Sequence, residues 1–345
     1  MQRFGAWGVF AVMVVVLLLL LAAASSWFAG ERGAVTGTLQ GKKVRSPIGA
    51  SSWPVTTVTC YYAMPSKYAA GRYEQWIADF FRTLSEARLV VFTDRQSLPL
   101  LERCVREAGN DAGARTRLVL HERHEWFVQR RHAAYFRLCH AMDAERALHN
   151  PQLYAVWNQK PFFVHEAMRL DPFRSDLFLW TDIGCFRNGV EPALARFPRV
   201  DGPQPREAKL PPGKLTVFMI TAFSAQEEQE FARIRESGVR ELPAALQARP
   251  RAPADASSLL CEWTGPAQWD RVQGGCFAGD RAAWTEYVAL YRQELARFAR
   301  NGLQRGWFAG KEQNLVAALL AWRPELFHRV DVPNGDWHWY RWYFA

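Results

Sequence analysis

The sequence lacks the short patterns that assign many proteins to a class at sight. Six cysteines occur among its 345 residues, but none has C-x-x-C or zinc-finger spacing, so we expect structural thiols. No internal repeat is visible, and no run of five or more basic residues occurs. The net charge of +9 would suit an anionic partner, but scattered arginines on a solvated surface are the better explanation. The lack of a clustered basic and aromatic face argues against nucleic-acid binding.

Charge is also absent from Phe4–Gly30, and this absence predicts a membrane-targeting segment. Its densest apolar part, Val9–Ala24, is long enough to span or nearly span a hydrocarbon core about 30 Å thick. A short basic start and the small residues AAASS also fit a cleavable signal peptide. We favour a retained anchor within residues 1–30, because the apolar stretch exceeds the usual core of a signal peptide.

The charges that flank this segment conflict over its orientation. Arg3 precedes it, whereas more basic residues follow it, and by the positive-inside rule this favours a cytoplasmic C-terminal domain. We expect the opposite, because an N-terminal apolar segment usually directs export and large domains translocate largely regardless of charge. The expectation is a single-pass type II membrane protein with a lumenal or exported domain, in the Golgi or ER of a eukaryote.

Strand and helix signals alternate through most of the remaining chain. Residues 31–53 are rich in Gly, Ser, Thr and basic residues and are expected to form a flexible stem, and residues 54–345 one folded domain. Regular alternation implies an α/β fold with a mostly parallel, doubly wound sheet. The expected strands are Val55–Tyr62, Ala87–Asp94, Arg115–Glu122, the run ending at Asp182, and Leu215–Thr221; the expected helices are Arg72–Leu84, Leu98–Gly109, a long stretch to Met168 broken at His149–Pro151, Arg281–Phe298 and Glu312–Trp322.

The run DLFLWTDIGCFR, Asp176–Arg187, is the most informative segment. Large apolar residues end at Asp182, and Gly184 follows two positions later. A buried parallel strand that ends at an acid delivers the carboxylate to the carboxyl edge of the sheet, where α/β folds bind ligands. The alternative is that Asp182 only opens a turn.

Four other segments would meet Asp182 at that edge if the topology is right. Asp94 ends another strand, beside the end of the first strand, where nucleotide-binding α/β folds place base and ribose. Lys160 lies on the helix before the Asp182 strand and would meet a phosphate or a base, although a surface lysine is an equally good interpretation.

The last two of these segments lie late in the chain, each at an expected helix start. Gly274 and Gly275, in VQGGCFAGD, would let the backbone approach a ligand closely. Lys311, Glu312 and Gln313 begin the next helix. For each segment, a turn with no role in ligand binding is an equally good interpretation.

The combined motifs resemble a known family. W-N-x-K-P-F-F and F-x-W-T-D-I-G, with VTCYY upstream and GGCFAGD and GKEQN downstream, are similar to the HtrL/YibB-like family of largely uncharacterised proteins. The resemblance covers most of 54–345. That family in turn resembles the GT-A class of nucleotide-sugar glycosyltransferases, which implies a Rossmann-like sheet and an Asp-x-Asp motif that binds a divalent cation.

The resemblance implies roles for individual residues. Asp182 matches the first acid of Asp-x-Asp, but Gly184 stands in place of the second, which puts the metal in doubt. His338, with Asp336 beside it in the aromatic tail, resembles the C-terminal histidine that completes the metal shell in some GT-A enzymes. Asp182 and His338 are therefore the predicted ligands of Mn²⁺ or Mg²⁺.

The other roles follow from the same resemblance and from the chemistry of glycosyl transfer. Gly274 and Gly275 match the acceptor-side segment, and Glu312 or Gln313 matches the acidic helix start. Because the departing diphosphate gains negative charge, Lys160 and Lys311 are candidates to stabilise it, and Glu312 is the candidate base. Asp94 and Gln313 complete the predicted substrate-binding set.

These observations favour a membrane-anchored glycosyltransferase-like protein that transfers sugar from a nucleotide sugar to a glycan or glycoconjugate acceptor. A catalytically inactive member that binds glycans or partners through the same pocket is the alternative, and the missing second acid supports it. A metal-dependent hydrolase is a third interpretation, but no histidine and aspartate cluster with recognisable spacing occurs.

Overall fold

The helices and strands follow the predicted alternation closely in the first half of the chain. The structure, a computed structural model, describes residues 55–65, 70–110, 114–195, 197–199, 209–247, 249–251, 262–264 and 271–345. The expected anchor and stem, residues 1–53, lie outside this part. Within it, no helix combines the length and the apolar character that crossing a membrane requires.

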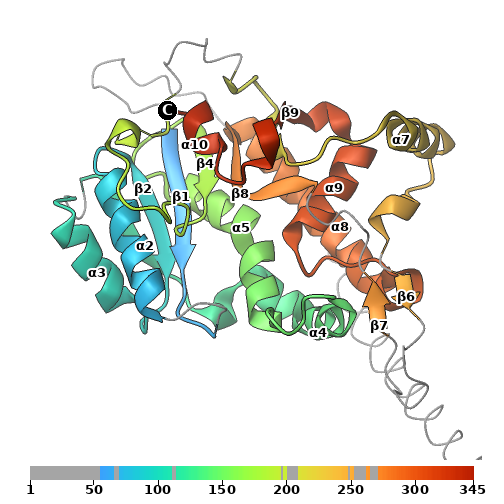
Figure 1. Ribbon diagram of the computed structural model, residues 1–345, viewed down its shortest axis with the longest axis horizontal. Helices are drawn as coiled ribbons and strands as arrows, with labels where there is room; N and C mark the ends of the chain where they lie inside the picture. Colours follow the sequence, from blue (N-terminus) through green and yellow to red (C-terminus); the bar gives the residue numbers. More distant parts are fainter. Residues whose placement is uncertain are drawn as a thin grey trace, which may run out of the picture. The chain divides into compact units, whose positions relative to one another are not determined.

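Seven strands form one mixed sheet in the order β3-β2-β1-β4-β8-β5-β9 (Figure 1). Six of them run in the same direction, and β8 runs antiparallel to its neighbours β4 and β5. The expectation of an α/β domain with a mostly parallel sheet is therefore confirmed. The strands are β1 Val55–Tyr61, β2 Leu89–Thr93, β3 Thr116–Leu120, β4 Leu177–Thr181, β5 Leu215–Met219, β8 Val272–Asp280 and β9 Phe327–Asp331; β6 Arg249–Arg251 pairs with β7 Glu262–Thr264 apart from this sheet.

Helices cover both faces of the sheet, as the doubly wound pattern requires. One hydrophobic cluster joins alternate side chains of β1 and β2 to α4, α5, α8 and α9, and a second joins the opposite side chains to α2, α3 and the C-terminal segment. The helices are α2 Ala70–Thr83, α3 Leu98–Glu107, α4 Phe127–Met142, α5 Pro151–Leu170, α7 Ala225–Ser237, α8 Arg281–Arg305, α9 Glu312–Trp322 and α10 Tyr340–Tyr343.

Local sequence signals explain several helix ends. Helix α5 begins at the predicted break, where the Asn150 side chain accepts a hydrogen bond from Leu153 N at 3.0 Å and Pro151 occupies the first helical position. Helix α3 ends before Gly109, which takes a left-handed φ of +68°. Helix α9 has the predicted bounds, whereas α8 continues beyond the predicted Phe298 to Arg305.

The prediction that Gly274 and Gly275 lie in a turn at a helix start is wrong. They lie inside β8, a nine-residue strand between β4 and β5, and Asp280 at its end caps α8 through a hydrogen bond from Ala283 N. Glycine in a strand marks a close approach by other groups. A Cβ at Gly274 would lie 2.6 Å from Glu312 Oε1, and one at Gly275 would lie 2.5 Å from Gln273 Nε2.

The aromatic C-terminal segment packs as expected, but only in part. Tyr340 and Phe344 are buried in the second cluster, whereas Trp337 and Trp342 are 40% and 50% exposed. Thr181 at the end of β4 and Tyr340 join their hydroxyl groups at 3.1 Å. The segment thereby lies against the carboxyl end of β4.

Candidate active site

The sheet topology places a ligand-binding crevice beside Asp182. From β1 the chain continues outward to β2 and β3 and then returns to the other side of β1 with β4. Ligands of open α/β sheets bind at the carboxyl ends of the strands where the order reverses in this way. Asp182 directly follows β4 at this position, and its side chain is 44% exposed.

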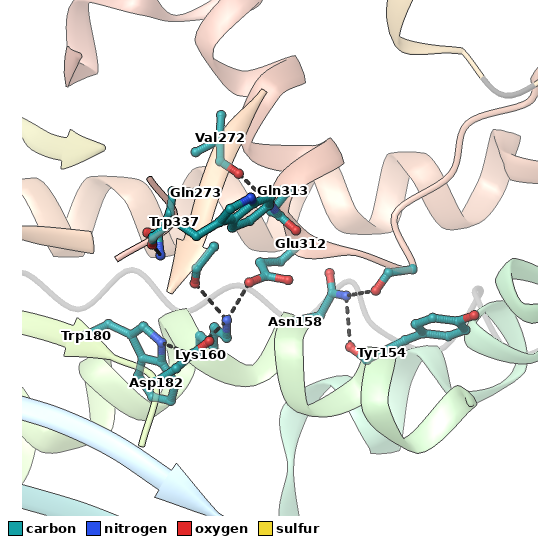
Figure 2. Close-up of polar contacts among 12 residues, drawn as sticks. Tyr154, Asn158, Lys160, Trp180, Asp182, Val272, Gln273, Glu312, Gln313 and Trp337 are labelled. Carbon is teal, nitrogen blue, oxygen red and sulfur yellow. Dashed lines mark hydrogen bonds and ion pairs between the residues drawn. The ribbon is translucent and has the colours of Figure 1, made fainter. Parts of the chain in front are cut away.

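The ammonium group of Lys160 is the centre of the polar contacts at this edge (Figure 2). Lys160 Nζ lies 3.0 Å from Asp182 Oδ1, 2.5 Å from Glu312 Oε1 and 2.8 Å from the carbonyl oxygen of Gly274. These acceptors match the three protons of an ammonium group. The side chain of Lys160 is 3% exposed, so α5 delivers a buried cation to two carboxylates from different parts of the chain.

Charge compensation keeps Lys160 protonated. Burial alone would lower its pKa, but the carboxylates of Asp182 and Glu312 outweigh burial and raise the pKa above its usual value. Burial raises the pKa of Glu312, and Lys160 opposes this shift. The buried thiol of Cys60, on β1, has a raised pKa for the same reason, reinforced by Asp182. Two carboxylates against one ammonium leave a net negative charge beside the crevice.

Other contacts fix the orientation of Asp182. Its Oδ1 also accepts a hydrogen bond from Trp180 Nε1 at 2.9 Å (Figure 2). The backbone N–H of Asp182 donates to Gly275 O at 3.0 Å. Oδ1 is thus held by a lysine and a tryptophan. Within the described residues, the hydrogen bond and the ion pair to this carboxylate both reach Oδ1.

The start of α9 lies behind β8 and is nearly inaccessible. Glu312 is buried in its ion pair with Lys160, and Gln313 Nε2 donates to the carbonyl oxygen of Val272. The fold brings together at this edge six of the residues predicted from the sequence: Lys160, Asp182, Gly274, Gly275, Glu312 and Gln313. The structure does not test their predicted roles.

Lys311 points to a different part of the molecule. Its ammonium group pairs with Glu145, in the connection between α4 and α5. Within the described residues, this ion pair holds Lys311 against the connection between α4 and α5, so the geometry does not support its predicted place beside Lys160 at the ligand.

Asp94 lies at the same edge, two strands away from Asp182. Its Oδ1 accepts a hydrogen bond from Ser97 N at 2.9 Å, and its Oδ2 lies 3.2 Å from Arg123. Together with Trp126 and Gln152, these two residues line a hollow of about 440 Å³. The aspartate therefore helps to start α3 and also faces a space large enough for part of a small ligand.

The C-terminal segment reaches the site through Gln273. Gln273 Nε2 donates to Trp337 O at 2.8 Å, next to His338 (Figure 2). Among the residues that the structure describes, the ring atom Nδ1 of His338 is buried without a hydrogen-bond partner, as is Gln273 Oε1. Burial lowers the pKa of His338 to about 4, with contributions from Arg341 and Arg187, and the Asp182 carboxylate opposes this shift. The neutral imidazole is therefore within electrostatic reach of Asp182.

The predicted divalent cation fits this edge poorly. Gly184 offers no side-chain ligand, Asp182 Oδ1 is already occupied, and an ammonium group lies 3.0 Å from the same oxygen. His338 Nδ1 and Asp182 Oδ2 alone are too few protein donors for a hard cation, which prefers several oxygen ligands. The residues present do not form a metal site of the predicted kind.

A different group in the described part of the chain could hold a metal ion. Asp143, Glu145 and His149 have potential ligand atoms within 4.8 Å of one another. His149 Nδ1 lies 2.8 Å from Asp143 Oδ2, Tyr154 OH donates to the same oxygen, and Lys311 pairs with Glu145. Asp143 and His149 thus satisfy each other, and Lys311 satisfies Glu145, without an ion.

Gln273 contributes to the site but was not predicted from the sequence. Gln273 stands directly before the two glycines that were selected. Closeness to a selected residue was the only signal available, because the contacts depend on β8 running antiparallel to β4.

Comparison with known proteins shows only distant similarity. No family model and no curated protein matches the sequence. Mouse xyloside xylosyltransferase 1 in its apo form is similar in structure at 12% identity and a TM-score of 0.39, covering 80% of this chain and 84% of that protein. The 4-diphosphocytidyl-2C-methyl-D-erythritol synthase of Anaerococcus prevotii matches at 10% identity and a TM-score of 0.28, covering 79% and 95%. Likenesses this distant say nothing of what this chain binds, and the resemblance to the HtrL/YibB-like family stays a prediction.

Proposed function

We propose that this chain is a glycosyltransferase that takes a sugar from a nucleotide-sugar donor bound at the carboxyl ends of β1 and β4. The sequence resemblance to GT-A enzymes suggests this reaction, and the α/β sheet with its order reversal between β1 and β4 provides the crevice that it needs. In the reaction, the bond between the anomeric carbon and the diphosphate breaks, an acceptor oxygen bonds to that carbon, and the proton of the acceptor hydroxyl passes to the departing diphosphate or to solvent.

One observation carries the proposal: a carboxylate held in a fixed orientation at the strand end where the donor would lie. Lys160 and Trp180 both bind Asp182 Oδ1, while the side chain stays 44% exposed. Such a carboxylate accepts hydrogen bonds from sugar hydroxyls and stabilises positive charge that develops at the anomeric carbon. Asp182 thus acts on the donor sugar.

Glu312 has a different role from the one first expected. Its carboxylate is buried and occupied by Lys160, so it acts as a positioning residue that holds Lys160, and through it Asp182. The hollow beside Asp94 and Arg123 is the proposed place for the nucleoside part of the donor. A glycan or glycoconjugate is the proposed acceptor, and the N-terminal segment is proposed to anchor the protein with this domain in the lumen or outside the cell.

Release of nucleoside diphosphate from a panel of nucleotide sugars tests the proposal. The full chain should release it from at least one donor, with or without an added glycan acceptor, and Asp182→Asn should abolish this release. Asp176→Asn is the matched control, because Asp176 is an exposed acid at the opposite end of β4. No release from any donor, or equal release by wild type and Asp182→Asn, contradicts the proposal.

A non-catalytic glycan-binding protein is the second candidate. The absence of a second acid at Gly184 and the burial of Glu312 favour it, because they remove two groups on which transfer would otherwise depend. This candidate predicts that nucleotide sugars or glycans bind the wild-type chain while no diphosphate is ever released.

A further inference from the structure

A diphosphate in this crevice needs positive charge that neither predicted lysine provides. The three protons of Lys160 already meet Asp182, Glu312 and Gly274. Lys311 pairs with Glu145 away from the edge. The remaining net charge of the two carboxylates and one ammonium group is negative, so an anionic leaving group requires another cation.

Arg187 lies against Gly184, the residue that stands in place of the second acid of the motif. Its Nε donates to the carbonyl oxygen of Gly184 at 3.0 Å, so the side chain folds back over the turn that follows Asp182. The residue is exposed, and Arg187 is one of the charges that lower the pKa of His338. Because Asp182 acts on the same imidazole, Arg187 and Asp182 lie at one edge of the sheet.

Trp76 of α2 fixes the guanidinium group of Arg187. The guanidinium carbon lies 4.8 Å from the centre of the Trp76 ring, and the same ring lies 3.8 Å from the position that a Cβ on Gly184 would take. A second exposed arginine, Arg72, approaches this ring at 5.9 Å. Stacking on a buried tryptophan limits the motion of an otherwise flexible side chain and so reduces the entropy lost on binding.

We propose that Arg187 binds the diphosphate of the donor and takes the place of the divalent cation that Gly184 cannot help to hold. This inference rests on the proposed function for the identity of the ligand. A guanidinium group binds two phosphate oxygens through parallel hydrogen bonds, and it keeps its charge at every physiological pH. Asp182 then contacts the sugar, and Arg187 contacts the leaving group.

Calorimetric titration of the full chain with inorganic pyrophosphate and with a panel of nucleoside diphosphates, in EDTA throughout, tests this assignment. Wild type should bind in EDTA, and Arg187→Gln should bind about 10- to 100-fold more weakly, as expected for the loss of charge-assisted hydrogen bonds. Arg187→Lys should recover only part of the affinity, because it restores the charge but not the paired hydrogen bonds. Arg169→Gln is the matched control, since Arg169 is an exposed arginine in the last turn of α5, away from the edge. Melting temperatures of all variants check that each is folded.

The outcomes separate this inference from the proposed function. If nucleoside diphosphates bind wild type and Arg187→Gln equally, Arg187 is not the ligand while the donor site stands. If binding disappears in EDTA and returns with Mn²⁺, the replacement of the metal is wrong. If pyrophosphate binds in a manner that depends on Arg187 but no nucleotide does, the anion site stands and the proposed donor is wrong. Failure of wild type to bind any of these anions overturns both.

Discussion

Lys160 is the residue on which the geometry of the site depends most. It is a buried cation shared between a buried carboxylate, Glu312, and a half-exposed one, Asp182. Removing one partner of a buried ion pair costs much more than the pair itself contributes, because the other charge remains in a medium of low polarity. The lysine therefore determines both local stability and the orientation of Asp182.

Lys160→Met should accordingly lower the free energy of unfolding by about 3–5 kcal/mol, as measured by urea denaturation at pH 7. Adding Glu312→Gln should recover part of the loss, because the double variant no longer buries an uncompensated carboxylate. If Lys160→Met unfolds like wild type, or if the second change adds to the loss, the ion pair does not have the proposed role.

Residue types and positions in the sequence identified much of this site. Asp182, Lys160 and Glu312 were selected because a strand end, the preceding helix and a later helix start should meet at one edge, and they do. Arg187 and Gln273 were not selected. Their roles depend on a side chain folding back on Gly184 and on the antiparallel register of β8, neither of which has a local pattern. For the same reason, the sequence did not show that Lys311 points away.

At the scale of single elements, β8 sets how closely the start of α9 approaches Lys160 on α5. Its glycines allow the start of α9 to lie directly against the strand, and the backbone of β8 supplies an acceptor to Lys160. A stretch of glycines predicted a turn, because glycine weakens an isolated strand. Burial between two neighbouring strands outweighs that preference. β9 was missed as well, because it is only five residues long and just one of its side chains is fully buried.

Gly274→Ala tests the close approach at β8. The added Cβ would lie 2.6 Å from Glu312 Oε1, so Glu312 must move and its contact with Lys160 must weaken. We expect the free energy of unfolding to fall by about 1–3 kcal/mol, which lowers the melting temperature by several degrees. We also expect weaker nucleotide binding. Gly184→Ala is the control, because the nearest atom to its Cβ would be 3.8 Å away. Equal effects of the two changes contradict this account.

At the scale of the whole molecule, buried histidines make the stability of the fold depend on pH. Burial lowers the pKa of His132, on α4, to about 4, and the pKa values of His121 and His328 are lowered in the same direction by burial. A histidine whose folded pKa lies below 6.5 binds its proton more readily in the unfolded chain. Stability is therefore complete above about pH 6.5 and declines as the pH falls toward 4.

Thermal unfolding between pH 7.5 and pH 4.5 measures this decline. At about 1.4 kcal/mol for each unit of pKa, His132 alone accounts for up to about 3 kcal/mol of it. His132→Gln should flatten the pH dependence while it lowers stability at pH 7.5, because glutamine fills the site without taking a proton. A wild-type stability that rises as the pH falls from 6.5 to 5 would show that other groups dominate.

Membrane attachment is a prediction for the full chain, since residues 1–53 lie outside the described part. A spanning helix within Phe4–Gly30 should keep the protein in the membrane fraction after alkaline carbonate washing. A soluble protein whose N-terminus lies near Ser25 would show that a signal peptide had been removed instead.

The reversed direction of β8 also has a consequence for how the chain folds. β1 to β4 pair among themselves, but β5 and, beyond it, β9 reach the sheet only through β8. Until residue 280 has emerged from the ribosome, the hydrophobic edge of β4 has no partner, and an open edge of this kind recruits other chains. Pairings between distant segments form slowly. We therefore expect aggregation during synthesis to be most severe for chains that stop between β5 and β8. The sheet is completed only when β8, which contains Gly274 and Gly275, pairs with β4, which ends directly before Asp182.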